Sequence, residues 1–174
     1  NTQLDITQPK FSNVTNSLGA ATDCDVSFGT QLNYSYSNNT PTNSPATNDQ
    51  LMMKSMMGTS STSSHYLGVT SVPYERYDVY VYFGGPGSDA TTPYNFNACC
   101  QEPDGAGGWV TVTPTYWIRD SNKQWSGSFT LATATTDVDL VDGGENYMRF
   151  EGLTNSSVRI YIASITRRGG PSGS

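Results

Sequence analysis

The sequence predicts an all-β fold, an antiparallel two-sheet β-sandwich with at most one short helix. Apolar and polar residues alternate along several short segments, which recur roughly every 10 to 20 residues. Gly, Pro or Asn separates these segments, as expected for turns. No long helical pattern lies between them, which excludes a parallel βαβ architecture and favours antiparallel sheets packed face to face.

We expect the strands to follow one another along one domain, residues 1–174. The alternation places them at Leu4–Phe11, within Cys24–Ser37, and at Tyr66–Val72, Tyr77–Phe83, Gly108–Asp120, Ser126–Thr136, Asn146–Leu153 and Ser157–Arg167. The density of Pro and Asn in Asn38–Asp49 predicts a loop. Residues 168–174 form a Gly/Ser tail.

The same alternation assigns the two faces of a strand, because successive side chains point to opposite sides. The residues expected to face the core are Val79, Val81, Phe83, Val158, Ile160 and Ile162. The residues expected on the opposite faces are Asp78, Tyr80, Tyr82, Arg159 and Tyr161.

Gln50–Gly58 is the one segment with a helical pattern. Its four methionines, at positions 52, 53, 56 and 57, would share one face of a short helix or turn. Either this face closes one end of the sandwich, or it offers an adaptable methionine-rich binding surface.

The amino-acid composition argues against nucleic acid as a partner and against a membrane span. Charged residues make up only 14% of the chain and the net charge is −6, so Ser, Thr and Asn supply a neutral polar surface. The nine basic residues are scattered, whereas binding to nucleic acid needs clustered Lys and Arg. The sequence also lacks an apolar run of about 18 residues, so we expect no membrane span.

The three cysteines predict one disulfide. Adjacent cysteines rarely bond to each other because their geometry strains the bridge. We therefore expect Cys24 to pair with Cys99 or Cys100, leaving one thiol free. The alternative is three buried free thiols in a cytosolic protein.

Four Asn-x-Ser/Thr sequons are consistent with an exported, glycosylated protein. They begin at Asn13, Asn33, Asn38 and Asn155. Together with the neutral surface they predict an extracellular or cell-surface location.

Two stretches resemble a family of secreted bacterial β-sandwich modules found in large surface proteins. They are "VPYERYDVYVYF", Val72–Phe83, and "NYMRFEGLT", Asn146–Thr154, and the resemblance extends over residues 45–168. It implies a jelly-roll sandwich related in shape to galactose-binding-like modules. Such modules often bind sugars, although a fold alone does not establish a function.

In that family a further apolar strand usually follows, whereas this chain continues as "RRGGPSGS". Either the sequence stops short of that strand, or another segment or subunit supplies it. Residues 1–11 have the length and alternation to add a strand to a neighbour's sheet, which predicts assembly by strand exchange.

The sequence does not favour an enzyme. His65 is the only histidine, which excludes a zinc site built on several histidines. No Gly-x-Ser-x-Gly motif marks a hydrolase nucleophile. Glycoside hydrolysis needs two carboxylates across a cleft, and no pair is singled out by its spacing.

The acidic run "DVDLVDGGE" is a candidate Ca²⁺ loop. Its carboxylates could gather hard oxygen ligands around the turn at Gly143–Gly144, although the run does not match an EF-hand. The candidate ligands are Asp137, Asp139, Asp142 and Glu145. The alternative is a solvated acidic hairpin without metal.

Aromatic residues are the candidates for ligand binding, because sugar rings stack on flat Trp and Tyr side chains. The residues chosen are Tyr116, Trp117, Trp109 and Trp125. Adjacent side chains on a strand point to opposite faces, so this alternation allows at most one of Tyr116 and Trp117 to lie in the core.

The sequence is compatible with two functions. In the first, the chain is a non-catalytic extracellular module that binds a polysaccharide or other glycan, with Ca²⁺ as a candidate ion. Alternatively, it is a structural subunit that joins copies of itself into a fibre or surface layer by strand exchange, and that carries sugar itself.

Overall fold

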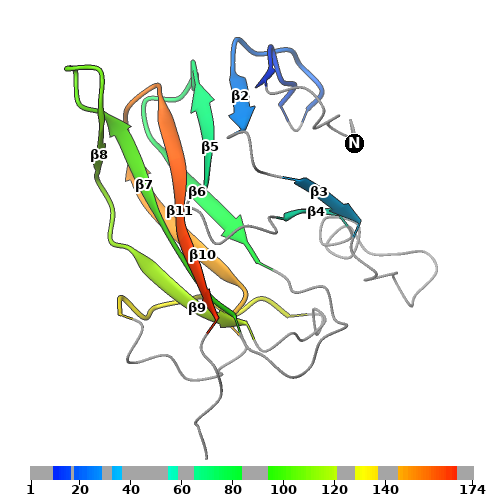
Figure 1. Cartoon of the computed structure of the whole chain (residues 1–174). Helices are drawn as coiled ribbons and strands as arrows, with labels where there is room; N and C mark the ends of the chain where they lie inside the picture. The colour runs from blue at the N-terminus through cyan, green and yellow to red at the C-terminus, as the bar shows by residue number, and fades with distance from the viewer. Residues whose placement is uncertain are drawn as a thin grey trace, which may run out of the picture.

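The computed structural model describes residues 10–16, 18–28, 33–36, 55–58, 65–83, 94–120, 128–136 and 145–167 (Figure 1). Regular structure in these residues is entirely β-strand. The strands are β1 Lys10–Phe11, β2 Asp25–Phe28, β3 Asn33–Tyr36, β4 Ser55–Gly58, β5 His65–Thr70, β6 Tyr77–Tyr82, β7 Tyr94–Pro103, β8 Trp109–Thr111, β9 Tyr116–Asp120, β10 Tyr147–Leu153 and β11 Val158–Arg167.

The strands form two facing antiparallel sheets, which confirms the predicted sandwich. The large sheet has the order β1-β2-β5-β11-β7-β8, and β9 also pairs with β7. The small sheet pairs β6 with β10, which lie behind β7 and β11 in Figure 1. The chain passes from the large sheet to the small one and back, from β5 through β6 to β7 and from β9 through β10 to β11, in a jelly-roll-like manner. A separate pair, β3 with β4, is also antiparallel.

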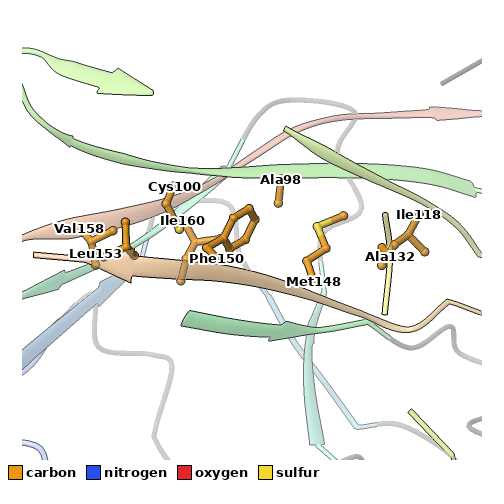
Figure 2. Close-up of a cluster of buried hydrophobic side chains, with 9 residues drawn as sticks. All are labelled: Ala98, Cys100, Ile118, Ala132, Met148, Phe150, Leu153, Val158 and Ile160. Carbon is orange, nitrogen blue, oxygen red and sulfur yellow. The ribbon is translucent and has the colours of Figure 1, made fainter. Parts of the chain in front are cut away.

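The core lies between these two sheets (Figure 2). Its buried side chains are Ala98, Cys100, Ile118, Ala132, Met148, Phe150, Leu153, Val158 and Ile160. Val79, Val81, Phe83 and Ile162 pack against this cluster. The predicted core faces of β6 and β11 are therefore confirmed.

The sequence did not predict β7, although it lies inside the large sheet, between β11 on one side and β8 and β9 on the other. Its inner face carries Ala98 and Cys100, which are fully buried. Ala, Asn and Cys are small or polar residues with little intrinsic preference for strands. This segment is therefore a strand because it pairs on both sides and is buried against β10, and not because of its local propensity.

The predicted strand 108–120 is divided into β8 and β9. At the break the Val112 N–H donates to the Cys100 carbonyl at 3.0 Å. The Cys100 N–H in turn donates to the Thr113 hydroxyl, Oγ1, at 2.8 Å. Pro114 follows and has no N–H to donate to a ladder. The side chain of Thr113 takes the place of a backbone acceptor for the Cys100 N–H.

The predicted strand 126–136 is wrong for its described part, 128–136. Only Leu131 forms an isolated bridge, with Tyr147. The Ala132 N–H donates to the Tyr147 carbonyl and the Trp117 N–H donates to the Ala134 carbonyl, each at 2.8 Å. This segment therefore links β10 of the small sheet to β9 of the large sheet and closes the sandwich on that side.

The predicted helix at 50–58 is also wrong where the structure describes it. Residues 55–58 form β4, in which Met56 and Met57 pair with Ser35 and Tyr34 of β3. A nine-residue helical pattern is too short to be stable by itself, whereas pairing with β3 satisfies the backbone groups directly. Residues 50–54 lie outside the described residues.

The predicted disulfide is absent, because Cys24, Cys99 and Cys100 are all free. Cys24 directly precedes β2, and β5 and β11 separate β2 from β7. Three strand spacings amount to roughly 14 Å, twice the distance of about 7 Å that a disulfide spans between Cα atoms. Burial raises the pKa of the Cys100 thiol to about 12, so this thiol remains protonated.

Residues Lys10 and Phe11, at the end of the segment proposed for strand exchange, pair with β2 of their own chain. Residues 1–9 and 168–174 lie outside the described residues. No helix in the part of the chain that the structure describes is long and apolar enough to cross a membrane.

Candidate functional site

The three predicted binding aromatics that the structure describes do not come together. Tyr116 and Trp117 face opposite sides of β9, as predicted. The Tyr116 ring lies 5.7 Å from the Phe150 ring and packs against the core. Trp117 is opposite Asn97, which is only 6% exposed, so this part of the outer face is largely buried.

Trp109 is further away, on β8 at the other end of β7. Its ring lies against the guanidinium of Arg159, 4.7 Å from ring centroid to Cζ. Trp125 lies outside the described residues. The four residues therefore do not form one platform among the residues described.

Exposed aromatic side chains gather instead on the outer face of the small sheet. Tyr80 and Tyr82 on β6 are 47% and 39% exposed, and Tyr147 on β10 is directly opposite Tyr82. The Tyr147 ring stacks on both: its centroid is 6.4 Å from that of Tyr80, with 23° between the ring planes, and 5.8 Å from that of Tyr82, with 30° between them. We call Tyr80, Tyr82 and Tyr147 the tyrosine face. Phe129 closes one side, with its ring edge-on to Tyr82 at 5.2 Å.

A fixed positive charge borders the tyrosine face. Arg149 is opposite Tyr80 in the β6–β10 register, and its Cζ lies 5.5 Å from the Tyr80 ring centroid. Arg149 Nη2 is 2.8 Å from Asp78 Oδ2 and also 2.8 Å from Glu151 Oε1. Hydrogen bonds with Asp78 raise the pKa of Arg149. The guanidinium is thus charged and held at one place beside the rings.

Asp78 completes this arrangement from β6. Its Oδ2 accepts hydrogen bonds from Arg149, and its Oδ1 accepts one from the Gly152 N–H at 2.9 Å. These bonds, those from Arg149 above all, lower the pKa of the Asp78 carboxyl. A carboxyl that acts as a general acid needs a raised pKa instead.

Two hollows adjoin Arg149 at the edge of β10 that faces away from β6. They measure about 220 Å³ and 310 Å³, and Tyr116, Arg149 and Glu151 line both of them. Val112–Pro114 and Phe150 complete the first hollow, and Leu131–Thr133 and Thr135 complete the second. We call the two hollows together the edge groove. It offers hydroxyl, carboxylate and guanidinium groups beside one aromatic ring.

The proposed calcium loop is mostly outside the described residues, since these include only Glu145 of its four carboxylates. In the described part of the chain no three His, Cys, Asp or Glu side chains gather in a way that could hold a metal. His65, the only histidine of the chain, is 3% exposed on β5.

The four sequons lie in different settings. Asn13 is exposed, with a left-handed φ of 57°. Asn33 begins β3, and Asn38 is outside the described residues. Asn155 is partly buried, and its Oδ1 accepts a hydrogen bond from the Ser157 N–H at 3.0 Å.

Sequence reasoning did not select Tyr147 or Arg149. The signal was present in "NYMRFEGL", where alternation with the buried Met148 and Phe150 places both residues on the outward face. What the sequence could not supply is the pairing of this strand with β6.

Comparisons with known proteins found no matching family model, no matching curated protein and no matching solved structure. The likeness to secreted bacterial surface modules is therefore an expectation from the motifs alone.

Proposed function

We propose that this chain is a non-catalytic extracellular module that binds carbohydrate on the tyrosine face and in the adjoining edge groove. The observation that carries the proposal is the row of three stacked rings on a strand pair, in which Tyr80 and Tyr82 are exposed and Tyr147 is half-buried. Tyr and Trp present a large flat area at a low cost in conformational entropy, and the C–H faces of sugar rings stack on such surfaces.

Polar groups beside the rings suit a ligand that is rich in hydroxyls. Arg149 offers donors, and Asp78 and Glu151 offer acceptors, within one ion-paired cluster. Because these groups hold one another in place, a sugar meets them without a further ordering cost. The small groove and the exposed rings fit a chain lying along the surface, not one enclosed in a pocket.

The charges on this face support binding without catalysis. The carboxylates of Asp78 and Glu151 both pair with the same guanidinium. The lowered pKa of Asp78 keeps it ionised, so it is unsuited to protonate a leaving group. An extracellular location rests on the sequons and the neutral polar surface, since the disulfide no longer supports it.

Binding of the purified chain to a panel of immobilised polysaccharides tests the proposal. We expect retention on at least one of them, and a loss of roughly tenfold in affinity for Tyr82→Ala, because stacking of a ligand ring on an aromatic side chain contributes about 1–3 kcal/mol, as for nucleic-acid bases, and about 1.4 kcal/mol is tenfold. Tyr74→Ala is the matched control, since Tyr74 is 56% exposed but lies outside the tyrosine face.

Thermal unfolding must show that both variants are folded. Absence of binding to every polysaccharide, or equal binding by Tyr82→Ala and Tyr74→Ala, contradicts the proposal.

The alternative, a structural subunit assembled by strand exchange, has one observation in its favour. Among the described residues only Leu131 pairs with the second edge of β10, at Tyr147. The rest of that edge could accept a strand from another copy. Deletion of residues 1–11 should then abolish polymerisation while leaving a folded monomer, and polymers that form without these residues exclude this exchange.

A further inference from the structure

Arg159 lies on the outer face of the large sheet, on the opposite side of the sandwich from the tyrosine face. Its neighbours along β11, Val158 and Ile160, are buried in the core, so Arg159 points away from it. Directly opposite it are Gly68 of β5 and Gln101 of β7.

Three aromatic rings surround the Arg159 guanidinium. The distance from Cζ to the ring centroid is 4.7 Å for Trp109, 5.5 Å for Tyr66 and 5.8 Å for Tyr161. The rings come from β8, β5 and β11, so they approach from different sides. Contacts of this kind restrict the side chain to one orientation before any ligand arrives.

A hydrogen-bond chain fixes the guanidinium further. Arg159 Nε donates to Gln101 Oε1 at 2.6 Å, and Gln101 Nε2 donates to Thr111 Oγ1 at 3.2 Å. Thr111 thereby orients the amide so that its oxygen faces Arg159. Since Nε is engaged, the terminal nitrogens Nη1 and Nη2 remain as the two prongs of an end-on fork.

No carboxylate among the described residues pairs with this guanidinium. The described ion pairs are Lys10 with Asp25, and Arg149 with Asp78 and with Glu151. Arg159 is thus a partly buried, oriented positive charge with no carboxylate counter-ion among the described residues, in a chain whose net charge is −6. A fork of this kind matches a carboxylate with two parallel hydrogen bonds.

We propose that the Arg159 cluster, formed by Arg159, Gln101, Tyr66, Tyr161 and Trp109, is a second binding site, for the carboxylate of an acidic sugar. The carboxylate meets Nη1 and Nη2, and the sugar ring lies against the neighbouring aromatic faces. Tyr66, which is 42% exposed, is the ring most open to such a ligand. The site shares no residue with the tyrosine face, so it does not depend on the function proposed above.

Polygalacturonate and its fully methyl-esterified form provide a matched pair of probes, because they differ only in the carboxylate. Affinity electrophoresis of the intact chain should show retardation by the acidic polymer and little by the ester. The chain itself is acidic, so general charge attraction does not mimic this result.

The variants separate charge from geometry. Arg159→Gln and Arg159→Lys should each weaken retardation by roughly tenfold or more, since lysine keeps the charge but loses the fork. Lys10→Gln changes the net charge by the same amount as Arg159→Gln at a distant position and should bind normally. Tyr74→Ala should also bind normally, because Tyr74 is an exposed ring that belongs to neither proposed site.

A measurement on the unaltered chain keeps the proposal testable if the Arg159 variants do not fold. Glucuronate should change the tryptophan fluorescence, glucose should not, and Trp109→Phe should remove the change. Equal retardation by both polymers, no retardation by either, normal binding by folded Arg159→Gln, or identical fluorescence with glucuronate and glucose overturns the proposal.

Discussion

Asp78 of β6 accepts both hydrogen bonds that the Arg149 guanidinium donates across the small sheet, at 2.8 and 3.3 Å from the same oxygen, Oδ2. The other oxygen accepts the Gly152 N–H at 2.9 Å. The register shifts between Phe150 and Leu153, so that two residues of β10 lie opposite Asp78. One carboxylate therefore stabilises a β-bulge and positions the charge beside the tyrosine face.

Asp78→Asn should weaken the hydrogen bonds that join Asp78 to Arg149 and Gly152, and should change how the free energy of unfolding depends on pH in acid. The folded-state pKa of Asp78 lies below its ordinary value of 3.8, first because of the hydrogen bonds from Arg149 and then because of the Gly152 N–H. The ionised form is therefore favoured by folding, and its stabilisation is present above pH 3.8 and lost as the pH falls through the folded value. Urea unfolding at several acidic pH values should show that the free energy of unfolding falls less steeply for the variant than for the unaltered chain.

Glu151→Gln is the control for that experiment. Glu151 also meets Arg149 at 2.8 Å, but its side chain is 62% exposed, and exposed ion pairs contribute little to stability. The free energy of unfolding should change by less than about 0.5 kcal/mol. An equal effect of the two substitutions would argue against a special role for Asp78.

Gly152→Ala should destabilise the bulge. Gly152 has a φ of +71°, a left-handed conformation that costs an L-residue roughly 1–2 kcal/mol. A Cβ here would also lie 3.0 Å from Arg76 Nη2. Gly105→Ala is the comparison, because Gly105 has a similar φ of +76° but no atom within 4 Å of an added Cβ. The midpoint temperature of thermal unfolding should fall for both variants, and it should fall further for Gly152→Ala.

Much of the fold could be predicted from alternation alone. The core faces of β6 and β11 followed directly from "YDVYVYF" and "VRIYI". By contrast, β7 is rich in Asn, Ala and Cys, so only its place between two partner strands reveals it. The Met-rich segment satisfied a helical period in sequence, yet its last four residues pair with β3.

The candidate sites were harder to predict, because each depends on which strands become neighbours. The outward position of Tyr80 and Tyr82 was predicted, but their exposure depends on what covers that face. Tyr147 joins them only through the β6–β10 register, which the bulge at Gly152 helps to set. Likewise, alternation placed Arg159 and Tyr161 outward, whereas Trp109 and Tyr66 reach Arg159 only through the strand order of the large sheet.

Tyr77→Phe should change the stability at alkaline pH. The Tyr77 hydroxyl donates to the Asn155 carbonyl at 2.6 Å. Burial, and next the negative charge of Glu102, raise the pKa of Tyr77 to about 12 from an ordinary value of 10.0. Folding therefore favours the protonated form, and this stabilisation is present below pH 10 and lost as the pH rises towards 12.

The variant should lose about 1 kcal/mol of stability at neutral pH, because one hydrogen bond disappears. Its stability should then fall less steeply than that of the unaltered chain between pH 10 and 12. Chemical unfolding at several pH values measures both effects. Tyr74→Phe, at an exposed position, serves as the control, and the same alkaline slope in Tyr77→Phe and the unaltered chain would refute the assignment.

Thr113→Val tests the side chain that replaces a backbone acceptor between β8 and β9. The substitution keeps the shape of the residue but removes the oxygen that accepts the Cys100 N–H at 2.8 Å. Cys100 is fully buried, so water is poorly placed to take over this bond. An unpaired buried N–H typically costs about 1–3 kcal/mol, and we expect the free energy of unfolding to fall by that amount. Thr113→Ser retains the hydroxyl and should recover most of the loss, because the defect then lies in the hydrogen bond and not in the methyl group.

Amide exchange at Cys100 provides the local readout. Exchange should be faster in Thr113→Val than in Thr113→Ser, and unchanged protection in both would show that another group accepts this N–H.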